Sequence, residues 1–266
     1  MNNTITLYVS SPYSYKDVFD VFYSCYTRYW RKPSIPFVLS TNYEANYEGV
    51  EVISSGNLDD TWVERSLPAI EKIKTKYLLL MCDDLFICNS VNEEDIKRIV
   101  EIMDNNSINF CRLNPCTKGV PLNNGKYIKK LYKTTPYARN LQIGIFNREY
   151  LISIIKEGNR SAWDIESDWQ KESLSSRKEP FSDIVGVTIP IIHYIHGVQK
   201  GYLFPSAVNE LRRIGICIES GRPIMSKTQE IVLKLKIFLR TVFSPHLRYQ
   251  LKRSLKKIGV SFTSDY

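Results

Sequence analysis

Short apolar stretches and longer amphipathic stretches alternate along the first part of this chain. The β-rich stretches at 4–10, 36–41 and 50–54 have the length and composition of strands. The stretches at 15–30 and 60–74 carry apolar residues at helical spacing. Strands that alternate with helices predict an α/β fold, in which helices flank a mostly parallel central sheet.

The alternation continues through the middle of the chain. It predicts helices at 92–104, 148–156 and 161–173, and strands at 108–113, 141–146 and 185–195. The stretch 117–139 is polar and has no strong periodicity, so we expect a loop or a hairpin there. Pro68 interrupts the helical pattern at 60–74, and we expect a kink or a helix that starts near Ser66.

The most informative stretch is KYLLLMCDDLFICN, residues 76–89. Residues 78–81 are all apolar, as in a strand that is buried on both faces of a parallel sheet. Asp83 and Asp84 follow at the end of that strand, where ligands of such sheets collect. Adjacent carboxylates repel each other by roughly 1 to 4 kcal/mol at ordinary effective dielectrics. A divalent cation carrying a phosphate would offset this repulsion; a helix cap plus a salt bridge is the structural alternative.

Composition limits the class of protein. With 266 residues and 43% hydrophobic content, the chain can bury a full core. Its six cysteines include no C-x-x-C pair, which argues against a zinc site and a disulfide framework. The first residues lack the features of a signal peptide, and about 20 apolar residues never run together. We therefore expect a cytoplasmic protein with reduced thiols.

The net charge of +8 lies in the C-terminal part of the chain. Residues 227–257 hold nine basic residues and one acidic residue, Glu230. Apolar residues recur there at helical spacing, before and after Pro245, with basic residues on the other side. We predict a domain over 1–222 and a basic amphipathic helical tail over 223–266 that binds the anionic inner leaflet of a membrane. No nucleic-acid motif is visible, so we expect no nucleic-acid partner; packing on a partner subunit is the remaining alternative.

Two further acidic or basic groups flank the apolar strand in sequence. Asp60 and Arg65 lie at the start of the helix at 60–74, and Arg65 presents a planar fork that suits a diphosphate. Equally, Asp60 fits an N-cap and Arg65 a surface ion pair. In SAWDIESDW, Asp164 has the capping-box spacing from Ser161, whereas Glu166 has no such structural role.

Glu166 lies between two tryptophans in that sequence, so partial desolvation would raise its pKa toward the range of a general base. A solvated helix face is the alternative. Of the histidines in HYIHG, His196 is the better metal-ligand candidate because it precedes a turn, although a lone histidine is more often structural. Lys200 in that turn suits a phosphate, and a solvated lysine is the plainer reading.

With these residues in view, the chain resembles glycosyltransferases of the GT-A fold that assemble bacterial surface polysaccharides such as O-antigen and capsule. The resemblance covers about 4–201 and rests on the order of its motifs: ITLYVSS, the pair Thr41 and Asn42, DDTWVER, YLLLMCDDLFI, LQIGIFNREYL and AWDIE. In that family, acids after the central strand coordinate a divalent cation and the donor diphosphate. The usual D-x-D spacing is replaced here by adjacent aspartates, with Cys82 in front.

The resemblance implies an enzyme that moves a sugar from a nucleotide-sugar donor to a lipid-linked glycan. The implied catalytic residues are Glu166, which would deprotonate the acceptor, and the nearby Asp164. The implied metal ligands for Mn²⁺ or Mg²⁺ are Asp83, Asp84 and His196. The expected donor-binding residues are Asn42, Asp60, Arg65, Asp83, Gln142, Gly144 and Lys200.

Two other functions stay open at this point. A nucleotidyltransferase would share the fold and the carboxylates, but should carry a glycine-rich basic loop after the first strand, which SSPYSYKD is not. A non-catalytic membrane scaffold would need only the tail. The sugar, the nucleotide, the stereochemistry and the oligomeric state stay open as well.

Overall fold

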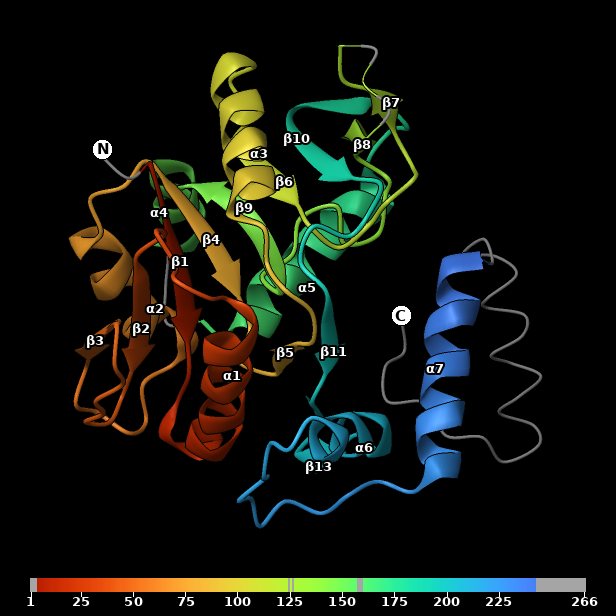
Figure 1. Cartoon of the computed structure of the whole chain (residues 1–266). Helices are drawn as coiled ribbons and strands as arrows, with labels where there is room; N and C mark the ends of the chain where they lie inside the picture. The colour runs from red at the N-terminus through yellow and green to blue at the C-terminus, as the bar shows by residue number, and fades with distance from the viewer. Residues whose placement is uncertain (1–3, 124, 126, 157–159, 243–266) are drawn as a thin grey trace.

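In the computed structural model, the chain is described at residues 4–123, 125, 127–156 and 160–242, with side chains described up to residue 235. Within this part, nine strands form one sheet in the order β3-β2-β1-β4-β9-β6-β10-β8-β7 (Figure 1). The strands are β1 (Ile5–Ser10), β2 (Phe37–Thr41), β3 (Val50–Ser54), β4 (Tyr77–Met81), β6 (Phe110–Arg112), β7 (Val120–Pro121), β8 (Ile128–Tyr132), β9 (Ile143–Asn147) and β10 (Pro180–Val187).

The sheet is mostly parallel, as predicted. Strands β3, β2, β1 and β4 run the same way, and β6 and β10 are parallel to each other. Strand β9 is inserted antiparallel between β4 and β6, so β4 and β6 also share a direction. As a result β1, β2, β4 and β6 all end at one edge, which we call the carboxyl edge.

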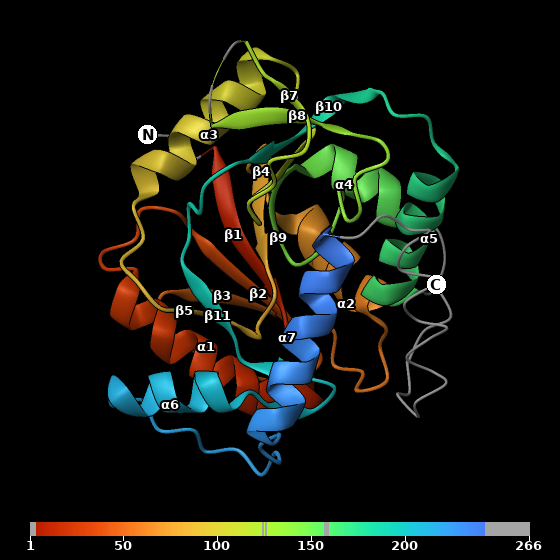
Figure 2. The same cartoon turned by 90° about the vertical axis from the view of Figure 1, so that its right-hand side faces the viewer.

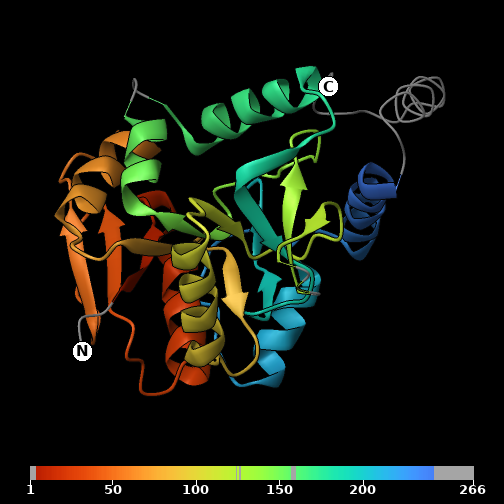
Figure 3. The ribbon, with the colours of Figure 1, turned by 90° about the horizontal axis from the view of Figure 1, so that it is seen from above.

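Helices cover both faces of the sheet, which confirms the α/β class (Figure 3). On one face lie α1 (Lys16–Tyr29) and α3 (Glu93–Asn105), and on the other lie α2 (Trp62–Lys72), α4 (Arg148–Ile155) and α5 (Ala162–Ser175). Strand β4 is buried along its whole length, because its alternate side chains enter the two cores.

The helix start expected near Ser66 was wrong. Helix α2 begins well before Ser66, because Thr61 and Glu64 form a capping box at its N-terminus. Thr61 is also the N-cap that we had considered for Asp60. Pro68 lies inside the helix at an exposed position, where water can reach the main chain that its missing N–H leaves unbonded.

The strand predicted at 185–195 is two strands. Strand β10 ends at Val187, Pro190 follows in a bend, and β11 (Tyr194–His196) pairs with the short β5 (Leu85–Ile87) outside the large sheet. The polar stretch at 117–139 contains the hairpin β7–β8. Among the described elements, five were not predicted from the sequence: a 3-10 helix (Tyr13–Tyr15), β5, the paired strands β12 (Val198–Gln199) and β13 (Tyr202–Leu203), and helix α6 (Pro205–Arg213).

The predicted tail begins as a helix, α7 (Lys227–Val242), which stands beside the body in Figures 1 and 2. Its first turn is fastened to α6, because the buried Glu230 carboxylate accepts a hydrogen bond from the Ser206 main-chain N–H and pairs with Lys234. The second predicted helix, after Pro245, lies outside the described residues. Among the described helices, none has the length and apolar content that crossing a membrane requires.

Gly144 in β9 gives a test of the packing. A Cβ at this position would meet the Phe110 ring at 2.3 Å, and that ring is already stacked on Phe146. We expect Gly144→Ala to lower the free energy of unfolding by about 1 to 3 kcal/mol, measured by urea denaturation. Gly221→Ala is the control, because nothing lies within 4 Å of its added Cβ and its φ is not positive. Equal stability of the two variants would contradict this packing.

Candidate functional site

Asp83 and Asp84 lie at the carboxyl edge, directly after β4, as predicted. Asp83 is 7% exposed, and its Oδ2 accepts a hydrogen bond of 2.5 Å from the Ser11 hydroxyl, which follows β1. Asp84 is half-buried, and its main-chain carbonyl accepts a hydrogen bond of 2.7 Å from the Gly197 N–H. The two strands that form the middle of the sheet therefore fix both aspartates, together with the loop after β11.

The environment of the pair disfavours negative charge. Burial, followed by the charge of Asp84, raises the pKa of Asp83 to about 7, although Ser11 and Arg65 act in the opposite direction. Burial also raises the pKa of Asp84 to about 6. Two carboxylates that are this hard to ionise together bind a proton or a cation readily.

Arg65 is the nearest cation to Asp83 on the β1 side. It is 5% exposed, its Nε donates to the Ser10 hydroxyl at 3.1 Å, and its Nη1 donates to the Asp60 carbonyl at 3.1 Å. Burial lowers the pKa of Arg65 overall, while the charge of Asp83 favours the protonated form of Arg65. Asp60 thus acts through its main chain, and its carboxylate is held by Asn57 at 2.7 Å.

Asn42, a predicted donor-binding residue, links two loops through its side chain. It is 2% exposed, its Oδ1 accepts from the Tyr13 N–H at 2.7 Å, and its Nδ2 donates to the Leu58 carbonyl at 2.8 Å. The side chain therefore ties together the loops that follow β1 and β3. It lies at the carboxyl edge, and both of its polar atoms bond to main-chain groups.

Glu166 reaches the same edge from α5. It is 7% exposed, and its Oε1 accepts a hydrogen bond of 2.6 Å from the Leu141 N–H. The Leu141 carbonyl in turn accepts from the Cys82 thiol at 3.2 Å. Asp83 and Asp84 follow Cys82 in the chain and Glu166 is linked to it through Leu141; after burial, the charges of these three carboxylates raise the pKa of the Cys82 thiol.

The chemistry of Glu166 fits a proton acceptor. Burial raises its pKa, while the hydrogen bond from Leu141 lowers it in part. Within the described residues, no hydrogen bond reaches its second oxygen, Oε2. Trp163 does not shield it, because that side chain is 74% exposed.

Asp164 does not lie with this group, so nothing in the geometry supports the catalytic role that was predicted for it. Two residues along a helix are about 200° apart, so Asp164 and Glu166 lie on opposite faces of α5. Asp164 is exposed and forms the capping box with Ser161, which lowers its pKa. It is a helix cap, as its spacing had also indicated.

Three other predicted residues have different surroundings. Gln142 lies beside the pair, because its carbonyl accepts from the Cys82 N–H at 2.8 Å. Gly144 is buried in β9 against Phe110, so packing alone accounts for the glycine. Lys200 is exposed at the tip of the β12–β13 hairpin, in the left-handed region with φ of 51°.

His196 pairs with Leu85, the residue after Asp84, and its ring packs edge-on against Tyr194. It therefore lies beside the carboxylates along the chain. No cluster of three or more histidine, cysteine or acidic side chains suited to a metal occurs within the described ranges. Asp83 and Asp84 alone fit Mg²⁺ or Mn²⁺ that is bound jointly with phosphate oxygens, since Mg²⁺ commonly uses one or two carboxylates plus substrate.

Sequence reasoning missed Tyr15 and Arg222. Arg222 lies 4.4 Å from the centre of the Tyr15 ring and pairs with Asp17 through two hydrogen bonds of 2.8 and 3.0 Å. That pairing raises the pKa of Arg222, and the charge of Asp83 adds to the effect. The charges of Asp83 and Asp84 likewise act on Tyr15. A second cation thus stands near the pair, from a segment without any motif.

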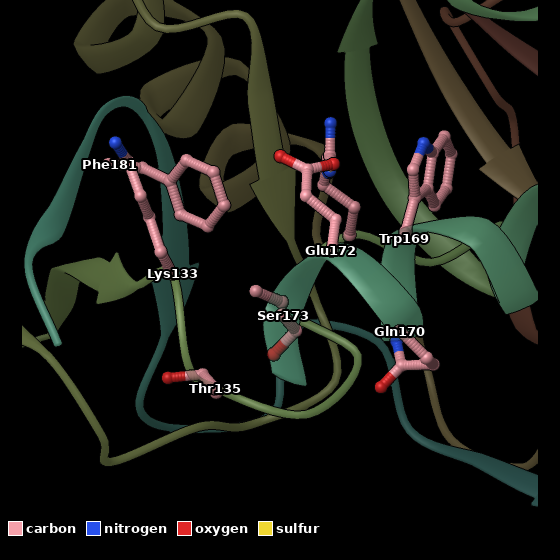
Figure 4. A pocket seen from close by; sticks show the side chains of 9 residues that line it. Lys133, Thr135, Trp169, Gln170, Glu172, Ser173 and Phe181 are labelled. Carbon is pink, nitrogen blue, oxygen red and sulfur yellow. The ribbon is translucent and has the colours of Figure 1, made fainter. Parts of the chain in front are cut away.

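Two cavities are described. One of about 10 Å³ holds at most a water molecule; Trp169, Glu172 and Phe181 line it in Figure 4. The cation that fills this region is Arg139, which stacks on Trp169 and Phe181 and pairs with Glu172. The other cavity, of about 500 Å³, is bounded by the segment 203–224 and includes Arg222 in its lining. Its volume is in the range of small-molecule sites.

The sequence matches no protein-family model and no curated protein. Among solved structures, TarS 1-349 of S. aureus in complex with UDP-GlcNAc is similar with a TM-score of 0.48 and 12% identity, over 80% of this chain and 65% of that one. CMP:2-keto-3-deoxy-manno-octonic acid synthetase complexed with CTP is similar with a TM-score of 0.47 and 12% identity, over 80% and 98%. The chain spans 60% of the length of the first TarS structure that it matches. Identities this low do not by themselves indicate a function.

The raised pKa of Asp83 predicts that its ionisation lowers the free energy of unfolding as pH rises, the opposite of a salt-bridged carboxylate. The folded-state pKa of about 7 lies above the unfolded value, so ionisation destabilises the fold as pH rises from about 4 to 7. Relative to wild type, Asp83→Asn should therefore gain about 1 to 4 kcal/mol in free energy of unfolding between pH 4.5 and pH 8, measured by urea denaturation. Asp164→Asn is the control: its folded pKa lies below 3.8, so its difference from wild type should stay flat between pH 5 and 8. A flat difference for Asp83→Asn would contradict the burial of that charge.

Proposed function

We propose that this protein is a glycosyltransferase, which moves a sugar from a nucleotide-sugar donor to an acceptor hydroxyl with the help of a divalent cation. One observation carries the proposal. Asp83, Asp84 and Glu166 converge on Cys82 at the carboxyl edge, all three with raised pKa values. Such a group supplies both a cation site and a proton acceptor.

The donor diphosphate would lie over the β1–β4 part of the edge. Asp83 is flanked there by two arginines whose charges act on it, Arg65 from α2 and Arg222 from the C-terminal segment. Guanidinium groups bind phosphate oxygens through paired N–H donors. A bound cation on Asp83 and Asp84 would supply Lewis-acid stabilisation of the charge that develops on the leaving diphosphate.

The acceptor would approach from the β9 side, where Glu166 lies. Its hydroxyl oxygen forms a bond to the anomeric carbon, while the bond from that carbon to the diphosphate oxygen breaks and the nucleoside diphosphate leaves. The hydroxyl proton passes to Oε2 of Glu166, the carboxylate oxygen that accepts no hydrogen bond within the described residues. The desolvated carboxylate is a stronger base than an exposed glutamate.

The tail supports a cellular setting for this reaction. The exposed side chains Ile231, Val232 and Leu235 form an apolar strip at the start of α7, in a segment rich in lysine and arginine. Such a helix lies in the plane of an anionic membrane surface. We propose that the enzyme is held on the inner face of the cell membrane and that it extends a lipid-linked glycan of surface polysaccharide.

Glu166 provides the sharpest test of the reaction. The full chain is incubated with UDP-, GDP- and dTDP-sugars and Mn²⁺, and release of the nucleoside diphosphate is followed, with water in place of the acceptor. Glu166→Gln should lower the rate by about 10² to 10⁴-fold and leave donor binding intact. Asp164→Asn, two residues away on the outer face, should keep the wild-type rate.

Three outcomes would overturn the assignment. An unchanged rate in Glu166→Gln would show that Glu166 is not the base. An equal loss of rate in Asp164→Asn would indicate that α5 is damaged and not that a catalytic group is lost. Pyrophosphate release from a nucleoside triphosphate and a sugar phosphate, without hydrolysis of any nucleotide-sugar, would favour the nucleotidyltransferase alternative.

The cation site has its own test by thermal unfolding. A nucleotide-sugar should raise the Tm of the full chain more with Mn²⁺ than without it, because a ligand that binds only the folded state stabilises it. Asp84→Asn should abolish the part that depends on Mn²⁺. Asp104→Asn is the control, because Asp104 bonds to Tyr77 at the other end of β4. A shift that depends on Mn²⁺ in Asp84→Asn would contradict the site.

Membrane attachment is tested by sedimentation with phosphatidylglycerol vesicles and with phosphatidylcholine vesicles. Wild type should bind the anionic vesicles, and the double variant Ile231→Glu, Leu235→Glu should bind at least about tenfold less, because two exposed apolar side chains no longer enter the interface. Leu174→Glu is the control, since Leu174 is 67% exposed on α5. Equal vesicle binding of all three proteins would show that α7 does not hold the protein on the membrane.

A further inference from the structure

Arg112 ends β6 at the carboxyl edge, on the far side of β9 from the aspartates. It pairs with Gly144 in β9, and Gly144 pairs in turn with Leu80 in β4. Leu141, which precedes β9, donates the hydrogen bond to Glu166. Arg112 therefore lies on the Glu166 side of the site, whereas Arg65 lies on the β1 side.

Arg112 is half-buried and is held only by carbonyl groups, whereas the buried Arg65, which also pairs with no carboxylate in the described part of the chain, donates to the Ser10 hydroxyl as well. Its Nε donates to Asn114 at 3.1 Å, and its Nη1 donates to Pro136 and Tyr137 at 3.2 and 2.9 Å. Arg139, Arg148 and Arg222 each pair with a carboxylate, but Arg112 forms no ion pair within the described residues. Its remaining nitrogen, Nη2, has no hydrogen-bond partner in the same part of the chain.

Asn114 and Tyr194 complete a group of polar side chains around this cation. The Asn114 amide donates to the Tyr194 hydroxyl at 2.6 Å, while the Asn114 Oδ1 is buried and, among the described residues, has no hydrogen-bond partner. The Tyr194 hydroxyl responds to the charges of Arg112 and Asp84. Tyr194 pairs with Ile87, three residues after Asp84, so this group lies near the aspartates and offers an unpaired cation and an unused acceptor.

The guanidinium of Arg112 is half-buried and pairs with no carboxylate among the residues that the structure describes, and a buried acceptor without a donor, such as Asn114 Oδ1, is costly. A ligand that carries an oxyanion next to a hydroxyl would satisfy both groups at once. Such a ligand would also need a cation close by, because the three carboxylates of the site would otherwise repel it.

We propose that Arg112, Asn114 and Tyr194 form an anion-binding acceptor subsite, so that the acceptor carries a phosphate or a carboxylate beside its reacting hydroxyl. Nη2 of Arg112 binds the oxyanion, and Asn114 Oδ1 accepts a hydrogen bond from an acceptor hydroxyl. The role of this subsite in binding the acceptor rests on the proposed glycosyl transfer, whereas the anion site itself does not depend on it.

The test measures binding of three small probes to the full chain by calorimetry: glycerol 3-phosphate, glycerate and glycerol. One or both of the anionic probes should bind saturably and identify the oxyanion, and glycerol should not bind. Arg112→Lys should weaken binding at least about tenfold, because lysine keeps the charge but loses the planar fork. Tyr194→Phe, which removes one hydroxyl and preserves the ring, should weaken it about threefold or more.

Arg148→Lys is the matched control. Arg148 also donates to a main-chain carbonyl, of Ile73, but it follows β9 at the opposite edge of the sheet. It should leave probe binding unchanged. The proposal is overturned if neither anion binds, if glycerol binds as well as the anions, or if Arg112→Lys and Tyr194→Phe, both folded by circular dichroism, bind like wild type.

The two proposals fail separately. Binding of a nucleotide-sugar with Mn²⁺ is measured on the same variants and should be unaffected by Tyr194→Phe. If the protein binds the nucleotide-sugar but none of the anions, only the proposed acceptor subsite is disproved. Anion binding that depends on Arg112, in a protein that binds no nucleotide-sugar, would leave the anion site in place and remove the glycosyltransferase.

Discussion

The desolvation of the Asp83 carboxylate is the constraint on which the site depends. A charge at the end of a fully buried strand has lost most of its water, and one hydroxyl, that of Ser11, replaces it directly. The neighbouring Asp84 makes ionisation harder still. Near neutral pH this edge of the sheet therefore holds a proton or recruits positive charge, and the arrangement of Arg65 and Arg222 around Asp83 follows from that need.

Positive charge reaches the pair from parts of the chain that are distant in sequence. Arg65 comes from the helix before β4, and Arg222 comes from a segment more than a hundred residues further on. Arg222 is held in place by its own partner, Asp17, and by the Tyr15 ring. A diphosphate would compete with Asp17 for the same guanidinium, so donor binding and the position of the 215–225 segment are coupled in this arrangement.

Most of the fold was predictable because its elements are long or strongly patterned. The strand at 50–54 and the buried run after Lys76 appear where their residues indicated. Short elements such as β5 carry too few residues to show a period. Pro68 misled the interpretation, because the capping box at Thr61 outweighs one lost hydrogen bond at an exposed position.

The site was predictable where geometry is local and unpredictable where partners are distant. The capping box at Ser161 marks the start of α5, and helical spacing then separates the exposed Asp164 from the buried Glu166. Asn42 looked like a ligand-binding residue, but its amide bonds to main chain at Tyr13 and Leu58, which no local pattern shows. Arg112 and Arg222 likewise gave no signal, since isolated arginines follow no period.

The hydrogen bond from Gly197 to the Asp84 carbonyl joins the metal-binding candidate to a residue more than a hundred positions later. The joint is tight, because any side chain at Gly197 would strike the Phe86 ring at 2.2 Å. During synthesis, the aspartate strand emerges long before β11, so this half of the sheet is made before its carboxylates have their final backbone support. The main-chain support of the Asp84 carbonyl is therefore completed only once β11 has been made, and an N-terminal fragment that retains β1 to β4 would carry both acids without it.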